Sequence, residues 1–165
     1  MRMKIVGALV LGLVTAAAIG IPVLAQQMAP ADAVKARQDL MKGLFPNHFR
    51  AFVAIARGES TDIASLPEKT QLAVAEVRKL PALFPPGTGR EAVPATRGKP
   101  EIWSERAEFE ANAAKLADET AKLGDIAKGG NLDAVKAQVA AVNQACTGCH
   151  GGPPKSGGKF RFEAE

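Results

Sequence analysis

Cysteine and histidine are scarce in this chain of 165 residues, which contains two of each. Three of these four residues nevertheless fall within five positions, in the stretch NQACTGCHGG that holds Cys146, Cys149 and His150. A disulfide between the two cysteines would close a loop of only one helical turn and would constrain little. A zinc site is also a poor match, because it needs four ligands and the sequence adds only the distant His48.

A large excess of charge of one sign is missing too. The chain carries 21 basic and 17 acidic side chains. Two of the basic residues, Arg2 and Lys4, lie in the first 25 residues, so the remainder is close to neutral. Proteins that bind nucleic acids show a concentrated basic footprint. We therefore expect no nucleic-acid partner.

The first 25 residues have the pattern of a secretory signal peptide. After the two basic residues comes an uncharged apolar run, which ends in the small residues of Val23-Leu24-Ala25 that a signal peptidase recognises. The run is about long enough to span a bilayer, so a retained anchor is the alternative. Pro22 and the cleavage pattern favour removal of residues 1–25. We expect a periplasmic mature chain, residues 26–165, without stable membrane association.

Strand patterns are absent, and apolar residues recur at helical spacing instead. The spacing predicts four helices, over residues 31–57, 60–80, 100–128 and 131–149. In the first, Phe45 and His48 fall on the inward face, and Gly43 with Pro46 predicts a kink. The Pro- and Gly-rich residues 81–99 form a long connection. The sequence therefore predicts one all-α domain, an antiparallel four-helix bundle with one long connection between helices two and three.

The apolar stripe of the fourth helix leads into the two cysteines. Leu132, Val135, Val139 and Val142 are spaced by three and four residues, and the same steps reach Cys146 and Cys149. A thioredoxin-like redox pair would instead lie at a turn from strand to helix. C-x-x-C-H is the attachment signature of c-type haem, in which two thiols bond the porphyrin and the histidine ligates iron. We predict one covalently attached haem c, held by Cys146, Cys149 and His150.

Three stretches of the chain together resemble the class II c-type cytochromes, the family of cytochrome c' and its low-spin relatives. These are the C-x-x-C-H at the end of the last helix, AVKARQDLMK at 33–42, and PEIWSERAEFE at 100–110. The resemblance covers the mature chain to Gly151. Beyond it, the family continues the last helix with an aromatic-basic pair, whereas GGPPKSGG intervenes here before KFRF. We expect a flexible tail from about residue 151.

The resemblance implies which residues face the other side of the iron. Alignment of the R-Q pair, Arg37 and Gln38, implies that these two residues line the cofactor and puts Met41 opposite His150. The thioether of Met41 is a soft ligand, as in the cytochrome c-556 type, and Arg37 lies one turn earlier, where it can meet a haem propionate. The rival ligand is His48, further along the same face.

We therefore expect an electron-transfer protein rather than an enzyme, with His150 and Met41 as iron ligands and other redox proteins as partners. The alternative is a five-coordinate haem protein that binds NO or CO, which requires that Met41 does not ligate or is easily displaced. A peroxidase would need an acid-base group near an open iron, and only His48 is available. Dimers are common in this family, so a homodimer stays open.

Overall fold

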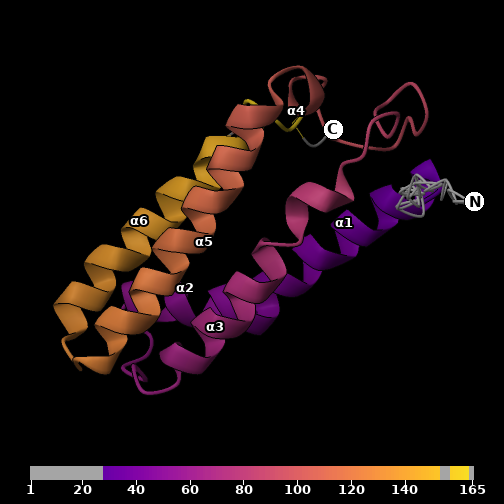
Figure 1. Ribbon diagram of the computed structural model, residues 1–165. Coiled ribbons are helices and arrows are strands. Elements are labelled where there is room, and N and C mark those ends of the chain that lie inside the picture. The colour runs from indigo at the N-terminus through magenta and orange to yellow at the C-terminus, as the bar shows by residue number, and fades with distance from the viewer. Residues whose placement is uncertain (1–27, 153–156, 164–165) are drawn as a thin grey trace, which may run out of the picture.

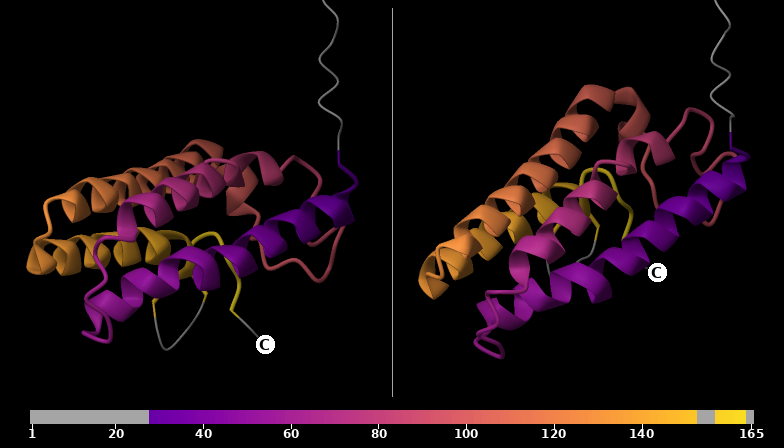
Figure 2. Two further views of the ribbon diagram at one scale, coloured as in Figure 1. Left: turned by 90° about the horizontal axis from the view of Figure 1, so that it is seen from below. Right: turned by 60° about the horizontal axis from the view of Figure 1, so that its bottom comes forward.

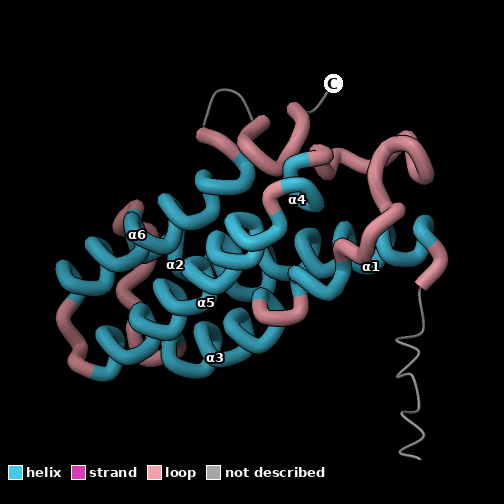
Figure 3. The backbone as a smooth tube through the Cα atoms, turned by 45° about the horizontal axis from the view of Figure 1, so that its top comes forward, coloured by secondary structure: helices cyan, strands magenta, loops and turns pink. Residues whose placement is uncertain are grey.

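The computed structural model describes residues 28–152 and 157–163, so the expected signal peptide lies outside the described residues. The described chain is helical (Figure 3), and its one pairing of extended backbone is a single bridge between Gly98 and Arg161. The predicted all-α class is confirmed. None of the helices in the described ranges is both long and apolar enough to cross a bilayer. The elements are α1 (Pro30–Leu44), η1 (Phe45–Phe49), α2 (Arg50–Ala56), α3 (Leu66–Val77), η2 (Leu80–Leu83), α4 (Glu101–Ser104), α5 (Arg106–Lys128) and α6 (Leu132–His150).

The helices form two hairpins that pack into a bundle (Figures 1 and 2). The first arm runs through α1, η1 and α2, and α3 returns beside it. The second hairpin is made of α5 and α6. Contacts between the hairpins are made by α3 on α5 and by α2 on α6. The predicted antiparallel four-helix bundle is therefore confirmed, with the first predicted helix divided into three elements.

The predicted kink in the first helix is a π-helical turn, η1, which contains Pro46. A π-helical turn holds more residues than an α-helical turn, so the inward face changes register across it. His48 is accordingly buried, with 7% of its surface exposed, whereas Phe45 is 52% exposed. The expectation that Phe45 faces inward was wrong, because its neighbour Leu44, with 2% of its surface exposed, occupies the inward position instead.

Two helix boundaries also differ from the sequence pattern. The cluster at 60–62 forms a turn rather than a helix cap, in which Asp62 Oδ1 accepts a hydrogen bond from the amide of Ser65, and α3 begins at Leu66. The predicted third helix is interrupted at Glu105, where φ is −117° and ψ is 45°. The predicted cap of the last helix is confirmed, since Asn131 Oδ1 accepts a hydrogen bond of 3.0 Å from the amide of Ala134.

Buried apolar side chains form two clusters. The larger cluster, here called the main core, contains residues of α1, α2, α3, α5 and α6. Among them are Leu44, Phe52, Ile55, Val77, Leu123, Val135 and Val142. The smaller, here called the aromatic cluster, consists of Ile102, Phe109 and Phe160, with Phe84, Trp103 and Cys149 packed against it. Its rings meet edge to face, with centroids 5.0 Å apart for Phe84 and Phe109. The aromatic cluster lies where α4 and α5 meet the long connection.

Arg37 joins α1 to the long connection from inside the protein. Its side chain is 4% exposed. One Nη atom donates to Thr88 Oγ1 at 3.0 Å, the other donates to Thr88 O at 2.8 Å and to Thr96 Oγ1 at 2.6 Å, and the guanidinium lies 4.3 Å above the ring of Phe84. Burial lowers the pKa of Arg37 to about 10, which leaves the group cationic at neutral pH. The long connection is therefore folded around a buried cation.

Replacing Arg37 by leucine should destabilise the protein and release the long connection. The substitution leaves several buried oxygens without donors, and we expect the free energy of unfolding to fall by about 2–4 kcal/mol. Arg37→Lys should recover less than half of the loss, because one ammonium group cannot reproduce the fork of the guanidinium. Chemical denaturation measures the loss, and hydrogen exchange at Thr88 and Thr96 reports the release.

The control is Lys35→Ala, since Lys35 is exposed and its ion pair with Asp39 lies at the surface. A solvent-exposed pair adds little to stability, so this variant should unfold almost like the parent protein. Equal stability of the Arg37→Leu and Lys35→Ala variants would show that the buried hydrogen bonds of Arg37 do not stabilise the protein.

Candidate haem site

The C-x-x-C-H residues occupy the last turns of α6. Val135, Val139 and Val142 are buried against the main core, and both cysteines follow on the same face as half-buried free thiols. The predicted stripe is therefore confirmed. His150 is the last residue of α6 and is half-buried, and Gly151 ends the helix with φ of 73°. Packing of the valines thus turns all three functional groups toward the interior.

The two thiols lie against different parts of the interior. Cys146 packs on the main core, and Cys149 packs on the aromatic cluster. Burial raises the pKa of Cys146, and burial together with the charge of Cys146 raises the pKa of Cys149 to about 11. Both groups are therefore protonated thiols at neutral pH, unlike metal-ligating or nucleophilic thiolates. Within the described residues, no cluster of three or more His, Cys, Asp or Glu could hold a metal ion.

The imidazole of His150 is available as a ligand. Burial lowers its pKa, and the positive charges of Arg161 and Arg97 lower it further. The ring is therefore neutral at neutral pH, the state in which one nitrogen offers a lone pair. Two protonated thiols and a neutral imidazole on one helix, beside two apolar clusters, form a donor set that fits a covalently attached haem.

The residues predicted on α1 lie in three different environments. Met41 is half-buried and packs on the main core, the same cluster that Cys146 contacts. Gln38 is exposed. Arg37 is buried, and both of its Nη atoms are engaged by the long connection. The structure thus brings Met41 and Cys146 into one cluster, whereas the predicted cofactor contacts of Arg37 and Gln38 stay predictions.

His48, the rival ligand, is directed toward α3. Its Nε2 atom lies 3.7 Å from Oε2 of Glu76. Its Nδ1 atom is buried, and the described part of the protein offers it no hydrogen-bond partner. The structure thus directs this imidazole toward a carboxylate on α3, and the prediction of Met41 in preference to His48 stays a prediction.

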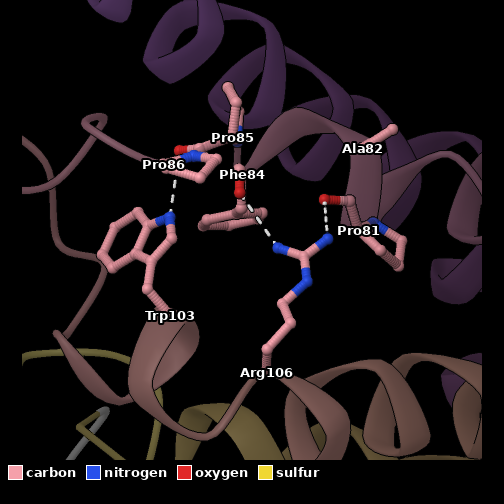
Figure 4. Close-up of a pocket in the computed structure, with 7 residues that line it drawn as sticks. All are labelled: Pro81, Ala82, Phe84, Pro85, Pro86, Trp103 and Arg106. Carbon is pink, nitrogen blue, oxygen red and sulfur yellow. Dashed lines mark hydrogen bonds between the residues drawn. The ribbon is translucent and has the colours of Figure 1, made fainter.

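The beginning of the long connection is fixed by two side chains from α4 and α5 (Figure 4). Trp103 Nε1 donates to Pro85 O at 2.9 Å, and Arg106 donates to Phe84 O at 2.9 Å and to Pro81 O at 2.8 Å. A shallow cavity of about 340 Å³ lies between these residues, and neither thiol lines it. No side-chain pattern in the sequence indicates this role of Arg106, because its partners are backbone carbonyls.

The segment after the haem motif also differs from the expected flexible tail. Residues 157–163 lie against the end of α6, and Phe160 is only 2% exposed. Its ring packs on Phe109, with centroids 5.4 Å apart, and joins Cys149 in the aromatic cluster. Apolar burial of this one ring explains why the segment is held against the bundle.

Comparison with known proteins agrees with this site. A family model described as Cytochrome C' matches residues 32–152. Cytochrome c' of Rubrivivax gelatinosus is 36% identical over 126 residues, which is 76% of this chain and 95% of the relative. Cytochrome c-556 of Rhodopseudomonas palustris is 34% identical over 128 residues, which is 74% of this chain and 83% of the relative.

Solved structures of this kind superpose on most of the bundle. The carbon monoxide complex of a variant of cytochrome c prime from Alcaligenes xylosoxidans has a TM-score of 0.67 and 28% identity, and the match covers 81% of this chain and 96% of that one. A ferrous variant of the same protein with bound NO has a TM-score of 0.69 and 26% identity, with 83% and 98% covered. The chain therefore belongs to the cytochrome c' family of class II c-type cytochromes and carries covalently attached haem c.

Proposed function

We propose that this protein is a periplasmic haem protein that binds small gas molecules such as CO or NO. In this proposal Cys146 and Cys149 form the thioether bonds, and His150 ligates the iron from one side. The haem would supply an iron that can take a further ligand. Gas binding requires that Met41 does not ligate this iron or is easily displaced from it, so the state of Met41 decides between this function and electron transfer.

The surroundings of Met41 support a small neutral ligand. The cluster on which Met41 packs consists of apolar side chains, among them Leu40, Leu44 and Phe52. Such a surface offers nothing to a charged or strongly polar substrate, whose desolvation would not be compensated. A diatomic gas needs no such compensation. Variants of one relative of the same fold, cytochrome c prime of Alcaligenes xylosoxidans, have been solved with carbon monoxide and with nitric oxide bound, which supports the same ligand class for this chain.

The second candidate is an electron carrier, and the chemistry of Met41 itself favours it. A thioether is a soft, unhindered ligand, and a histidine-methionine pair raises the reduction potential of a haem. The similarity to a cytochrome c-556 supports this reading as well. In that case Met41 would close the coordination position, and the protein would act with other redox proteins. Catalysis forms no part of either candidate, because the acid-base group that it would need, His48, faces Glu76.

Attachment of the haem should depend on both cysteines. Protein from the periplasm of cells that mature c-type cytochromes should stain for haem after denaturing electrophoresis, because thioether bonds survive denaturation. Replacing both Cys146 and Cys149 by alanine should abolish the stain. It should also leave little folded protein, since the bundle then lacks a large core group and cannot collapse to fill its space. A colourless parent band would contradict covalent attachment.

Absorption spectra and CO binding should separate the two candidates at Met41. If the protein binds gas, the reduced parent should be high-spin and take up CO quickly, and Met41→Leu should change the rate by less than about tenfold. If it is an electron carrier, the parent should be low-spin and bind CO slowly, and Met41→Leu should make it high-spin and fast. His48→Ala is the matched control and should leave spectrum and rate unchanged in both cases.

Two outcomes would contradict both candidates. One is a Met41→Leu variant, loaded with haem and reduced, that binds no CO. The other is a low-spin spectrum that is lost in His48→Ala and kept in Met41→Leu, since this would make His48 the sixth ligand.

A further inference from the structure

A second cavity of the protein, here called the basic cavity, is formed jointly by the long connection and residues 157–163 and has a volume of about 490 Å³. The side chains in its lining include Arg90, Lys99, Arg161, Phe162 and Glu163. Of the described residues that line it, none is a cysteine, His150 or Met41. Small-molecule sites commonly have volumes of about 300–1,000 Å³. The basic cavity is therefore large enough for a small ligand, and its residues differ from those of the candidate haem site.

Arg90 and Lys99 hold their charges at one aromatic ring in this lining. The guanidinium carbon of Arg90 lies 4.1 Å from the ring centroid of Phe162, and Nζ of Lys99 lies 5.6 Å from the same centroid. Nε of Arg90 donates to Thr96 O at 3.1 Å, and Nζ of Lys99 donates to Gly158 O at 2.7 Å. The ring and the carbonyls offset part of the desolvation of both cations, but they carry no negative charge. Two positive charges are thus fixed at the wall of the cavity.

Neither of these two cations is neutralised by a carboxylate of the described residues. Ion pairs occur elsewhere in the described residues, but none of them involves Arg90 or Lys99. Arg90 donates to the described chain through Nε alone, so both of its Nη groups keep their donors, and an ammonium group has three N–H donors in all. Arg161, the third cation of the lining, has interactions of its own. Arg90 and Lys99 are therefore the cations that a ligand can reach.

A further cation, Arg97, adjoins the basic cavity. The amide of Phe162 donates to Arg97 O at 2.9 Å, and one Nη atom of Arg97 donates to Phe162 O at 3.5 Å. Nε of Arg97 is buried and has no hydrogen-bond partner among the described residues. Like charges repel one another, so the gathering of Arg90, Arg97 and Lys99 around Phe162 costs free energy that a bound anion would offset. The charges and the buried donor both favour a ligand of negative charge.

Glu163 restricts the kind of anion that can bind. Its carboxylate lines the same cavity and repels an incoming negative charge. Hydrogen bonds to the guanidinium group are therefore needed in addition to simple attraction. Carboxylate and phosphate groups match the two-pronged geometry of a guanidinium, whereas a spherical ion such as chloride does not. The lining thus selects oxyanions over halide ions.

We propose that the basic cavity binds a small oxyanion, whose carboxylate or phosphate group accepts hydrogen bonds from the Nη groups of Arg90 and from Nζ of Lys99. The bound anion would connect the long connection with residues 157–163, because Lys99 belongs to the first segment and Phe162 to the second. Oxyanion binding requires neither gas binding nor electron transfer, since no residue assigned to either of them lines the cavity.

The first test is calorimetric titration of the haem-loaded protein with sodium phosphate and, separately, with sodium acetate, at an ionic strength kept constant with sodium chloride. We expect saturable binding, and the two titrations show whether a phosphate or a carboxylate group fits better. Arg90→Gln should weaken binding about tenfold or more, because it removes charge-assisted hydrogen bonds. Arg78→Gln is the matched control, since Arg78 is exposed at the end of α3 and does not line the cavity. It removes the same charge and should bind like the parent.

The second test concerns the carboxylate in the lining and the place of binding. Glu163→Gln should strengthen anion binding by about two- to fivefold, because it removes a negative charge from the cavity. Hydrogen exchange of the Phe162 amide should slow when phosphate is added to the parent protein, since a ligand that binds only the folded state opposes local opening. The same addition should leave exchange of this amide unchanged in Arg90→Gln.

Two results would overturn the oxyanion site. One is the absence of saturable binding of both phosphate and acetate to the parent protein. The other is equal affinity of the Arg90→Gln and Arg78→Gln variants, which would show that the anion responds to the overall charge of the protein and not to this cavity. Arg90 is exposed, so its substitution leaves no buried group without a partner and the folded variant can be titrated. Lys99→Gln, which can still donate to Gly158 O, provides an independent second variant and should also weaken binding.

Discussion

Burial of one face of α6 is the constraint on which the haem site depends. Val135, Val139 and Val142 lie on that face and pack into the main core. Because side chains three and four residues apart share a helix face, their burial also sets the direction of Cys146 and Cys149. His150 then follows at the last position of the helix. The attachment chemistry is thus positioned by ordinary hydrophobic packing.

The long connection is organised differently, by hydrogen bonds to the buried guanidinium of Arg37. Arg37 has neutral oxygens of Thr88 and Thr96 as partners and the ring of Phe84 beneath it. A buried charge is costly unless every donor finds an acceptor, so the connection must fold around the guanidinium. Phe84, held in this way, then packs against the aromatic cluster that Cys149 touches. A residue on α1 thereby shapes the wall next to the cysteine motif on α6.

Two further features of the chain lie near different residues of the candidate site. The π-helical turn η1 follows Met41 closely and turns His48 toward Glu76 of α3. Residues 157–163 lie against Cys149 and the end of α6. Met41 and His150, the two residues predicted to face the iron, are therefore held by separate segments of the chain.

The amino-acid sequence by itself determined the helical class, the long connection, the cap at Asn131 and the stripe that ends in Cys146, Cys149 and His150. These follow from spacing and local propensity, which neighbouring residues encode. Only the tertiary structure decided the register change that exposes Phe45, the interruption at Glu105, the partners of Arg37 and the return of Phe160 to Cys149. Each of these depends on atoms far apart in the chain, such as Thr96 against Arg37, whose contact is fixed by packing and by buried hydrogen bonds rather than by any local pattern.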